Sequence, residues 1–528
     1  MSVVKNAAVE TLLIKKKERA ETRISSKGPD IFSNRLDIFV FSIFAGRILL
    51  RSGVMQAILL TIYSLLLAAL VFISPSFILS SRIASPEEIK SAVERLPLFP
   101  MAISILYPIL AILIVCIYYI IINNILKKKE GTASASGKPQ GQVVARHLLF
   151  LLPLFPAIFL PAFTSDDIYY YLGLGRIQAM HGLNPYLNPI ASAAGDPLSA
   201  VSPWTKIPTM YAPGIVLFFR GIVHFAGPNL IAELILYRLF VLAAVLGASF
   251  FIRQILLEYR PAMADAGMAG FLLNPLILTE TIGNGHNDIF CILLLLSSFF
   301  ALLKNRESFS LILYFCAFLI KFPAIILLPL YLFLLFRRKG ISVWKDIWPA
   351  IIFIVAASLS VYFLFFRDSR AFKSFEILSF LWSPSTPGIL MLILRDYFGL
   401  PDRSLFAVLK ALRILFVFFA VYRATKVRSL HGFLEEAGIA TIVFYSLFSS
   451  YIWVWYFTGM LPFLFIRKRG DYLLPMTGLT AGGMLFWWYY FQNTSLDTLR
   501  TFAIEYFILL VPFFVLLLLT RFRPDPVS

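Results

Sequence analysis

The sequence predicts an all-α fold, a polytopic bundle of transmembrane helices. Of its 528 residues, 59% are hydrophobic and only 14% are charged, and the mean hydropathy is +0.81. A soluble protein of this length could not bury so much apolar surface. Lys and Arg (47) outnumber Asp and Glu (29), but they cluster at the ends of apolar stretches. That placement is typical of the positive-inside rule and argues against a nucleic-acid partner.

The N-terminal part is predicted to form a region of its own. Residues 1–53 are polar and basic and then amphipathic, as in a cytoplasmic tail leading into a surface helix. Residues 54–129 hold two apolar stretches and end at three consecutive lysines, which predicts a helix pair that returns to the cytoplasm. Residues 130–146 have linker composition. Residues 147–528 are predicted to form the main transmembrane domain, which holds the candidate catalytic residues.

Apolar stretches and basic clusters alternate along the chain and predict about fourteen spans, with both termini cytoplasmic. The expected spans are about 54–79, 99–126, 147–163, 230–256, 266–283, 287–303, 308–320, 323–336, 346–366, 405–422, 437–450, 453–466, 472–490 and 504–520. Residues 213–227 are short for a span and carry Arg220 and His224, so an interfacial or re-entrant helix is expected there. The two long polar segments, 164–212 and 367–404, both fall on the outer face.

Two adjacent carboxylates, Asp166 and Asp167, directly follow a predicted span. Ser165 as an N-cap, with acids in the first helical turn, would explain them structurally. One carboxylate would satisfy that role, and ionisable residues near a membrane core tend to be functional. We therefore interpret the pair as holding a general base at the outer boundary. The tyrosines at 169–171 would place aromatic walls beside it.

Four further residues of the same segment are candidates for binding the substrate: Arg176, Asn184, Tyr186 and Tyr211. Arg176 comes nine residues after Asp167, so the two need not share a helix face. It could meet a lipid phosphate, pair with Asp166, or be a plain interfacial arginine. The turn Asn184-Pro185-Tyr186 would project Tyr186 from a rigid corner. Tyr211 closes the segment in Tyr-Ala-Pro.

A second polar cluster joins an outgoing to an incoming span, so it is expected on the same outer face. Its candidates are Glu280, His286, Asn287 and Asp288. A glycine turn with Asn287 or Asp288 capping the next helix would be the structural explanation. Such a turn does not need Glu280, His286 and Asp288 together, which favours a functional role. His286 has no neighbouring histidine at metal spacing, so zinc is not expected.

Three candidates remain in the later spans. Lys321 lies between two short apolar pieces, where a lysine is costly unless it snorkels or meets an anion such as a lipid phosphate. Trp455 and Tyr456 lie at a predicted outer boundary, where an aromatic belt is the default and a sugar-stacking platform the alternative. The sequence has no Walker loop and no dinucleotide fingerprint, so no nucleotide-binding domain is expected.

These motifs have a familiar order. In sequence they are Ser165-Asp166-Asp167-Ile168-Tyr169-Tyr170-Tyr171, Gly175-Arg176, Gly182-Leu183-Asn184-Pro185-Tyr186, Tyr211-Ala212-Pro213, Asn274-Pro275-Leu276, Gly285-His286-Asn287-Asp288, Lys321-Phe322-Pro323, Leu328-Pro329, Trp455-Tyr456 and Leu461-Pro462. With them, about residues 147–470 resemble the polyprenyl-phosphate-sugar-dependent glycosyltransferases of the GT-C superfamily, the bacterial α-mannosyltransferases above all. Leu174 departs from the bulkier residue that such enzymes often carry before Gly-Arg.

The resemblance implies a hexosyltransferase in the inner (plasma) membrane that serves the cell envelope. It would move mannose or another hexose from a polyprenyl-phosphate donor to a glycan or glycolipid acceptor on the outer face, with inversion. Asp167 would be the general base, and Arg176, Lys321 or a divalent metal near Asp166 and Asp167 would balance the leaving phosphate. A flippase for a lipid-linked saccharide is the alternative. It would be built from two repeated halves with charges at the membrane midplane. The sequence shows no convincing internal repeat, and its polar clusters fall at the outer edge instead. A ligase that transfers whole oligosaccharides is a third possibility.

Overall fold

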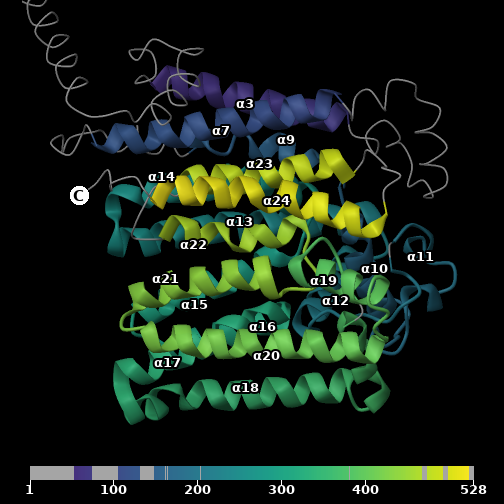
Figure 1. Cartoon of the computed structure of the whole chain (residues 1–528). Coiled ribbons are helices and arrows are strands. Elements are labelled where there is room, and N and C mark those ends of the chain that lie inside the picture. The colour runs from purple at the N-terminus through teal and green to yellow at the C-terminus, as the bar shows by residue number, and fades with distance from the viewer. Residues whose placement is uncertain are drawn as a thin grey trace, which may run out of the picture. The chain divides into compact units, whose positions relative to one another are not determined.

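The computed structural model describes residues 53–73, 105–130, 148–160, 162, 164–202, 204–379, 381–466, 473–490 and 497–521. The chain separates into two compact units, Met1–Gln56 and Ala57–Ser528, and the account below concerns the second. Every regular element in the described ranges is a helix, which confirms the predicted all-α membrane-type fold (Figure 1). The predicted tail up to residue 52 and the linker from residue 131 lie outside the described residues.

The described helices follow the predicted stretches in order. They are α3 (Gly53–Ile73), α7 (Tyr107–Glu130), α9 (Leu154–Phe159), α10 (Asp167–Ala179), η3 (Ile190–Ser192), α11 (Leu198–Val201), α12 (Pro213–Ala226), α13 (Leu230–Tyr259), η4 (Pro261–Met263), α14 (Ala264–Leu272), η5 (Ile277–Gly283), α15 (Asp288–Leu303), α16 (Glu307–Ile320), η6 (Phe322–Leu327), α17 (Leu328–Lys339), η7 (Gly340–Ser342), α18 (Val343–Phe365), η8 (Ser369–Ser379), α19 (Thr386–Asp396), α20 (Asp402–Lys426), α21 (Leu430–Val443), η9 (Phe444–Phe448), η10 (Val454–Gly459), α22 (Leu461–Ile466), α23 (Leu473–Tyr490) and α24 (Thr498–Arg521).

Several of these helices could cross a membrane. By length and composition, five helical stretches in the described ranges qualify: Tyr107–Leu126, Leu230–Tyr259, Phe322–Phe365, Asp402–Lys426 and Thr498–Leu519. A sixth is added if α14 and η5, which meet at a bend of 55°, count as one broken span. Many of the other predicted spans correspond to shorter apolar helices, such as α15 and α16. The count of about fourteen therefore stays a prediction.

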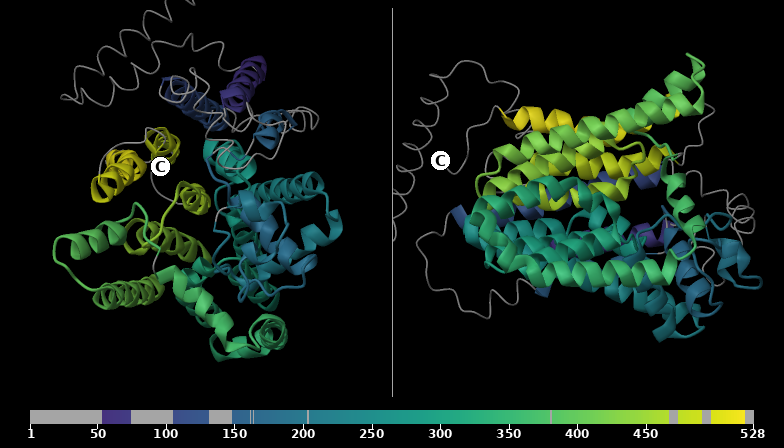
Figure 2. Two further views of the ribbon diagram at one scale, coloured as in Figure 1. Left: turned by 90° about the vertical axis from the view of Figure 1, so that its right-hand side faces the viewer. Right: turned by 90° about the horizontal axis from the view of Figure 1, so that it is seen from below.

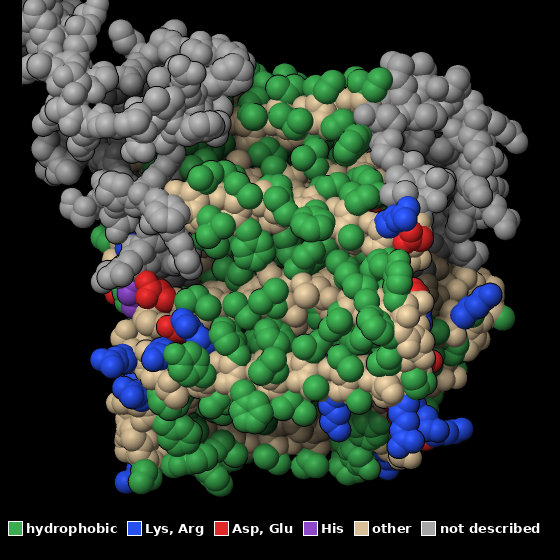
Figure 3. All heavy atoms as spheres, in the orientation of Figure 1, with side chains coloured by type: hydrophobic (Ala, Val, Ile, Leu, Met, Phe, Trp, Pro, Cys, Tyr) green, Lys and Arg blue, Asp and Glu red, His purple; other side chains and the backbone are tan. Residues whose placement is uncertain are grey.

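The surface of the second unit fits an apolar solvent. In Figure 3, hydrophobic side chains cover the middle of the visible face, and most Lys, Arg, Asp and Glu side chains lie toward its two ends. Large apolar side chains stand out from single helices, among them Phe418 of α20, which is 68% exposed, and Phe363 of α18, which is 57% exposed. An apolar band this broad marks a surface that lipid, rather than water, covers.

The two predicted polar segments meet at one end of the bundle. Elements α10 and α11 of the first segment and α19 of the second lie at the same end in Figure 1, and the left view of Figure 2 looks onto that end. The Asn184 side-chain amide donates to the carbonyl oxygen of Phe365 at 2.7 Å. The Tyr186 ring packs on Phe366, with centroids 4.7 Å apart. The candidate site is built at this end.

The predicted interfacial helix 213–227 is α12, which begins with Pro213 as its first residue, where a missing N–H costs nothing. It packs against α10, α13 and α16. At the crossing with α10, a Cβ added to Gly175 would lie 2.4 Å from the carbonyl oxygen of Phe219. Only glycine allows α10 and α12 to approach this closely.

Helix α14 stops at Leu272, just before Asn274 and Pro275, because Pro275 has no N–H with which to continue the helix. Two tyrosines of the N-terminal helices bond carbonyls at its end. The Tyr63 hydroxyl of α3 donates to the carbonyl of Leu273 at 2.6 Å, and the Tyr118 hydroxyl of α7 donates to that of Gly270 at 2.7 Å. These bonds satisfy carbonyls that a helix end leaves open and attach α3 and α7 to the break that precedes the second polar cluster.

A buried ion-pair network fixes the first polar segment to the bundle. The Arg176 guanidinium of α10 donates to Asp196 at 2.9 Å and to Glu233 of α13 at 2.6 Å, and the side chains of both acids are at most 1% exposed. Asp196 also accepts the backbone N–H of Leu198 and lies 3.2 Å from His181. One guanidinium thus balances two buried carboxylates, which is the chemistry for which a planar five-donor fork is suited.

Removing this guanidinium should destabilise the protein strongly. In Arg176→Leu both carboxylates would remain buried without their partner, so we expect a loss of about 3–5 kcal/mol and a lower melting temperature of the purified protein in detergent. Arg220 is an exposed arginine on α12, and Arg220→Leu, the matched control, should change stability by no more than about 0.5 kcal/mol. An Arg176→Leu protein that melts like the wild type would contradict a structural role for the network.

Candidate active site

Asp167 is the first residue of α10, and its neighbour Asp166 occupies the N-cap position. The expected N-cap, Ser165, lies one residue earlier; its hydroxyl accepts the N–H of Asp167 at 3.3 Å. The Asp166 side chain faces solvent, whereas that of Asp167 is only 15% exposed and points to the protein interior. The two adjacent acids therefore have different environments, and only Asp167 belongs to the buried cluster.

Asp167 shares its surroundings with Tyr171 and His286. Tyr171 follows at i+4 on the same helix face and donates its hydroxyl to Asp167 Oδ2 at 3.3 Å. The Tyr171 oxygen also lies 3.4 Å from His286 Nδ1, and His286 Nδ1 lies 3.7 Å from Asp167 Oδ2. The Tyr171 ring stacks on Phe219 of α12 and meets Tyr211 edge to face, so packing fixes its position.

His286 is completely buried in the turn between η5 and α15. The turn needs Gly285, whose φ is +74° and which has no room for a Cβ beside Ile168. The imidazole stacks on Trp455, with centroids 3.9 Å apart and planes 18° apart. Its Nε2 lies 3.7 Å from Glu280 Oε2 and has no hydrogen-bond partner among the described residues. Burial, and next the Lys321 ammonium, lower the pKa of His286 well below its usual range, so the ring is neutral at pH 7.

Glu280 is a buried carboxylate with a full set of donors. Its Oε1 accepts the Trp487 indole N–H at 2.8 Å, and its Oε2 accepts the Asn284 amide at 2.9 Å. The Thr164 hydroxyl adds a bond to Oε1 at 3.2 Å. Glu280 lies in the π-helical turn η5, a helix variant that often occurs at functional sites. It forms the wall of the cluster opposite Asp167, with His286 between the two.

Lys321 supplies the positive charge of the cluster. Its backbone is extended, with φ −152°, between α16 and η6, so the interruption turns the side chain inward. The ammonium lies 2.5 Å from Asp288 Oδ2, 3.4 Å from Asn287 Oδ1 and 4.7 Å from the centre of the Tyr456 ring. An ammonium has three N–H donors, so these contacts leave it able to meet a further anion.

The surroundings change the acidity of Asp167. Burial raises the pKa of this carboxyl to about 6, against lowering effects of the Lys321 ammonium and of the Tyr171 hydrogen bond; Asp166 and Asp288 add smaller upward effects. A carboxyl with this pKa is ionised at neutral pH and still basic enough to accept a proton. Asp167 therefore has the protonation behaviour of a general base.

Other predicted site residues have structural contacts. Arg176 is held by the buried network and is paired with Asp196 and Glu233 rather than with Asp166. Asn184 and Tyr186 hold the loop together: the Asn184 side chain accepts the N–H of Tyr186, and the Tyr186 hydroxyl donates to the carbonyl of Tyr211. Tyr211 is the exception, because its ring packs on Tyr171 beside Asp167.

Three residues of the cluster, Thr164, Asn284 and Trp487, were not predicted from the sequence. Tyr171 was expected beside the acids only as an aromatic wall, although its i+4 spacing puts its hydroxyl on the helix face of Asp167. Thr164 and Asn284 bond to each other and to Glu280, but only the fold brings them together. Trp487 lies 207 residues from Glu280 in sequence, and nothing in its local sequence indicates that contact.

A shallow apolar groove of about 540 Å³ reaches the residues next to this cluster. Its lining includes Phe322, which follows Lys321 in the chain, and Pro213, which is two residues from Tyr211. Its other lining residues are Phe315, Phe318, Leu319, Ser358, Val361, Phe366, Phe372 and Phe375. The groove has the chemistry of a site for a hydrocarbon chain.

The acids of the cluster do not form a metal site by themselves. Within the described ranges, no three His, Cys, Asp or Glu side chains meet in a geometry that could hold a metal ion. Asp166 and Asp167 provide two carboxylates, and one oxygen of Asp167 already accepts the Tyr171 hydroxyl.

Known proteins resemble this chain over part of its length. It is 28% identical over 233 residues to Alpha-(1->6)-mannopyranosyltransferase A of Mycobacterium tuberculosis, covering 41% of each chain. It is 31% identical over 153 residues to Alpha-(1->6)-mannopyranosyltransferase Rv1459c of the same organism, covering 28% of this chain and 25% of the relative. The similarity to these relatives thus spans less than half of their length.

A family model matches a larger part. The model described as Alpha-(1->6)-mannopyranosyltransferase, N-terminal domain, matches residues 50–337. The matched region contains Asp167, Tyr171, Glu280, His286 and Lys321, whereas Trp455 lies beyond it. With more than half of the chain matched, the protein belongs to the Alpha-(1->6)-mannopyranosyltransferase family.

Proposed function

We propose that this protein is a membrane glycosyltransferase that moves a hexose, with mannose as the first candidate, from a polyprenyl-phosphate donor to a glycan or glycolipid acceptor. The observation that carries the proposal is the cluster at the end of the bundle: a basic carboxylate, Asp167, and a lysine with donor capacity, Lys321, beside an apolar groove. The names of the mycobacterial relatives support the choice of mannose.

In the proposed reaction, Asp167 accepts the proton of the acceptor hydroxyl as that oxygen attacks the anomeric carbon of the donor. The bond from the anomeric carbon to the phosphate oxygen breaks, and its electron pair stays on the lipid phosphate, so the configuration inverts. Lys321 is the candidate cation for the developing phosphate charge. Neutral His286 and the Tyr171 hydroxyl hold the carboxylate in place; Arg176, already bound to two acids, is not assigned to this step.

The Phe-rich groove next to Lys321 supports a lipid-linked donor. With its phosphate at the ammonium, the donor could place its prenyl chain in the groove that the neighbouring Phe322 helps to line. We further propose that this end of the bundle faces away from the cytoplasm in the plasma membrane, because Lys and Arg clusters such as Arg337 to Lys339 lie at the other ends of the helices. A divalent ion on the donor phosphate, near Asp166 and Asp167, remains a further proposal that activity with and without chelator would test.

Replacing the base should abolish the chemistry and spare binding. For Asp167→Asn we expect kcat to fall by about 10²- to 10⁴-fold, because the amide cannot accept the proton, with little change in KM. The measurement is transfer from a polyprenyl-phosphate mannose donor to a short mannoside acceptor in proteoliposomes, followed by mass spectrometry.

The neighbouring variant Asp166→Asn is the matched control, since Asp166 faces solvent one residue away. It should reduce the rate much less. If the two variants lose the same fraction of kcat, or if Asp167→Asn transfers sugar normally, Asp167 is not the general base. If the wild-type protein transfers no sugar but moves lipid-linked saccharide across the bilayer, the glycosyltransferase proposal itself is wrong.

The pH dependence of sugar transfer should follow the ionisation of the Asp167 carboxyl. Activity depends on the ionised form, so kcat/KM should rise with pH through an apparent midpoint near the pKa of about 6 and level off above it. In Lys321→Gln the ammonium that lowers the pKa of Asp167 is gone, so the midpoint should move to higher pH and the plateau should fall. A midpoint that is unchanged in Lys321→Gln would show that another group limits the reaction.

A further inference from the structure

A second groove, of about 720 Å³, lies apart from the candidate active site. It runs over α15, with α13 on one side and α16 on the other. Helix α15 begins at Asp288, in the cluster, and the lining residue of α15 nearest to it is Ser297, nine residues or about 14 Å along the helix. The groove extends from there to Lys304, just after the helix, and shares no lining residue with the cluster, so it does not belong to the site already described.

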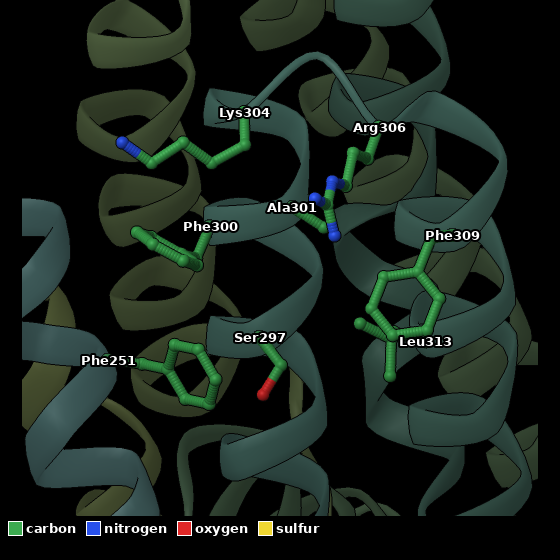
Figure 4. A pocket seen from close by; sticks show the side chains of 8 residues that line it. All are labelled: Phe251, Ser297, Phe300, Ala301, Lys304, Arg306, Phe309 and Leu313. Atoms are coloured by element: carbon green, nitrogen blue, oxygen red, sulfur yellow. The ribbon is translucent and has the colours of Figure 1, made fainter.

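The groove has a narrow floor and apolar walls. Two small side chains of α15, Ser297 and Ala301, form the floor (Figure 4). Phe251 and Phe300 form one wall, and Phe309 and Leu313 form the other. They recur at the three- and four-residue spacing of a helix face, so the groove follows the helix axis. A hydrocarbon chain could lie along it.

The end of the groove is basic. Arg306 lies at the start of α16, and Figure 4 shows its guanidinium turned back toward Ala301, between the two walls. Within the described ranges the Arg306 side chain has no ion pair or hydrogen bond. Lys304 lies on the other rim, where its ammonium is 2.5 Å from Glu258 and 5.4 Å from the centre of the Phe300 ring. The charges of Lys304 and Glu258 cancel. The net positive charge at this end of the groove is therefore that of Arg306.

We propose that this groove binds an anionic membrane phospholipid, with its phosphate at Arg306 and Lys304 and an acyl chain along the apolar floor. The charge of the rim complements a headgroup with a net negative charge and disfavours one that adds a quaternary ammonium. Basic pockets between helices at a membrane boundary are typical sites for such headgroups. The occupant would pack α13, α15 and α16 together at the end remote from the catalytic cluster.

The test compares phosphatidylglycerol with phosphatidylcholine on the full-length protein, purified in detergent and stripped of lipid. Native mass spectrometry counts the bound lipid, and thermal unfolding measures the stabilisation that binding confers. We expect one tightly bound phosphatidylglycerol and weaker binding of phosphatidylcholine. Arg306→Gln should weaken phosphatidylglycerol binding by about fivefold or more and phosphatidylcholine binding much less, so that the preference for the anionic lipid falls. Ser297→Phe, which fills the floor, should weaken both lipids.

The matched control is Arg337→Gln, an exposed arginine at the end of α17 that does not line the groove. It should bind phosphatidylglycerol like the wild type. Both arginines are exposed, so neither change is expected to prevent folding. Equal affinity of the wild type for the two lipids, or phosphatidylglycerol binding by Arg306→Gln that matches the Arg337→Gln control, would overturn the proposal. Unchanged binding in Ser297→Phe would also overturn it.

Discussion

The contact between the Lys321 ammonium and Asp288 is the constraint on which the cluster depends. A lysine in an apolar helix bundle needs an opposite charge close by, because no water competes to solvate it. Asp288 provides that charge as the first residue of α15, where the positive end of the helix also favours a carboxylate. The pair joins the break after α16 to the start of α15, and in doing so it fixes the turn that carries His286.

The same logic explains why the site lies where helices stop. Regular helices satisfy their own backbone hydrogen bonds, so an apolar bundle has few positions where a polar side chain finds a partner. Interruptions of the helices provide such positions: Pro275 ends a helix before Glu280, Gly285 turns the chain at His286, and Pro323 follows Lys321. Each break exposes backbone groups and turns a polar side chain inward, and the side chains then satisfy one another.

The sequence was sufficient to predict the helical fold, because apolar length and basic clusters are local signals. It also predicted that the two polar segments share one face, and in the structure elements of both lie at the same end of the bundle. The family resemblance singled out Asp167 over Asp166, and in the structure only Asp167 belongs to the buried cluster. It could not place Arg176, whose partners Asp196 and Glu233 are 20 and 57 residues away. For the same reason it did not predict that Asn184 and Tyr186, two expected substrate-binding residues, bond to the backbone of α18 and of the loop. Partner choice over such distances depends on packing, which no local pattern records.

The contacts of Glu280 and His286 have a consequence for dissecting the protein. The family match ends at residue 337, yet Trp455, which stacks on His286, and Trp487, which bonds to Glu280, come from beyond it. A fragment cut at the family boundary would keep His286 and Glu280 but lose Trp455 and Trp487, the two side chains that contact them. The buried cluster is therefore assembled from both parts of the chain, and helices beyond the family match are needed to complete it.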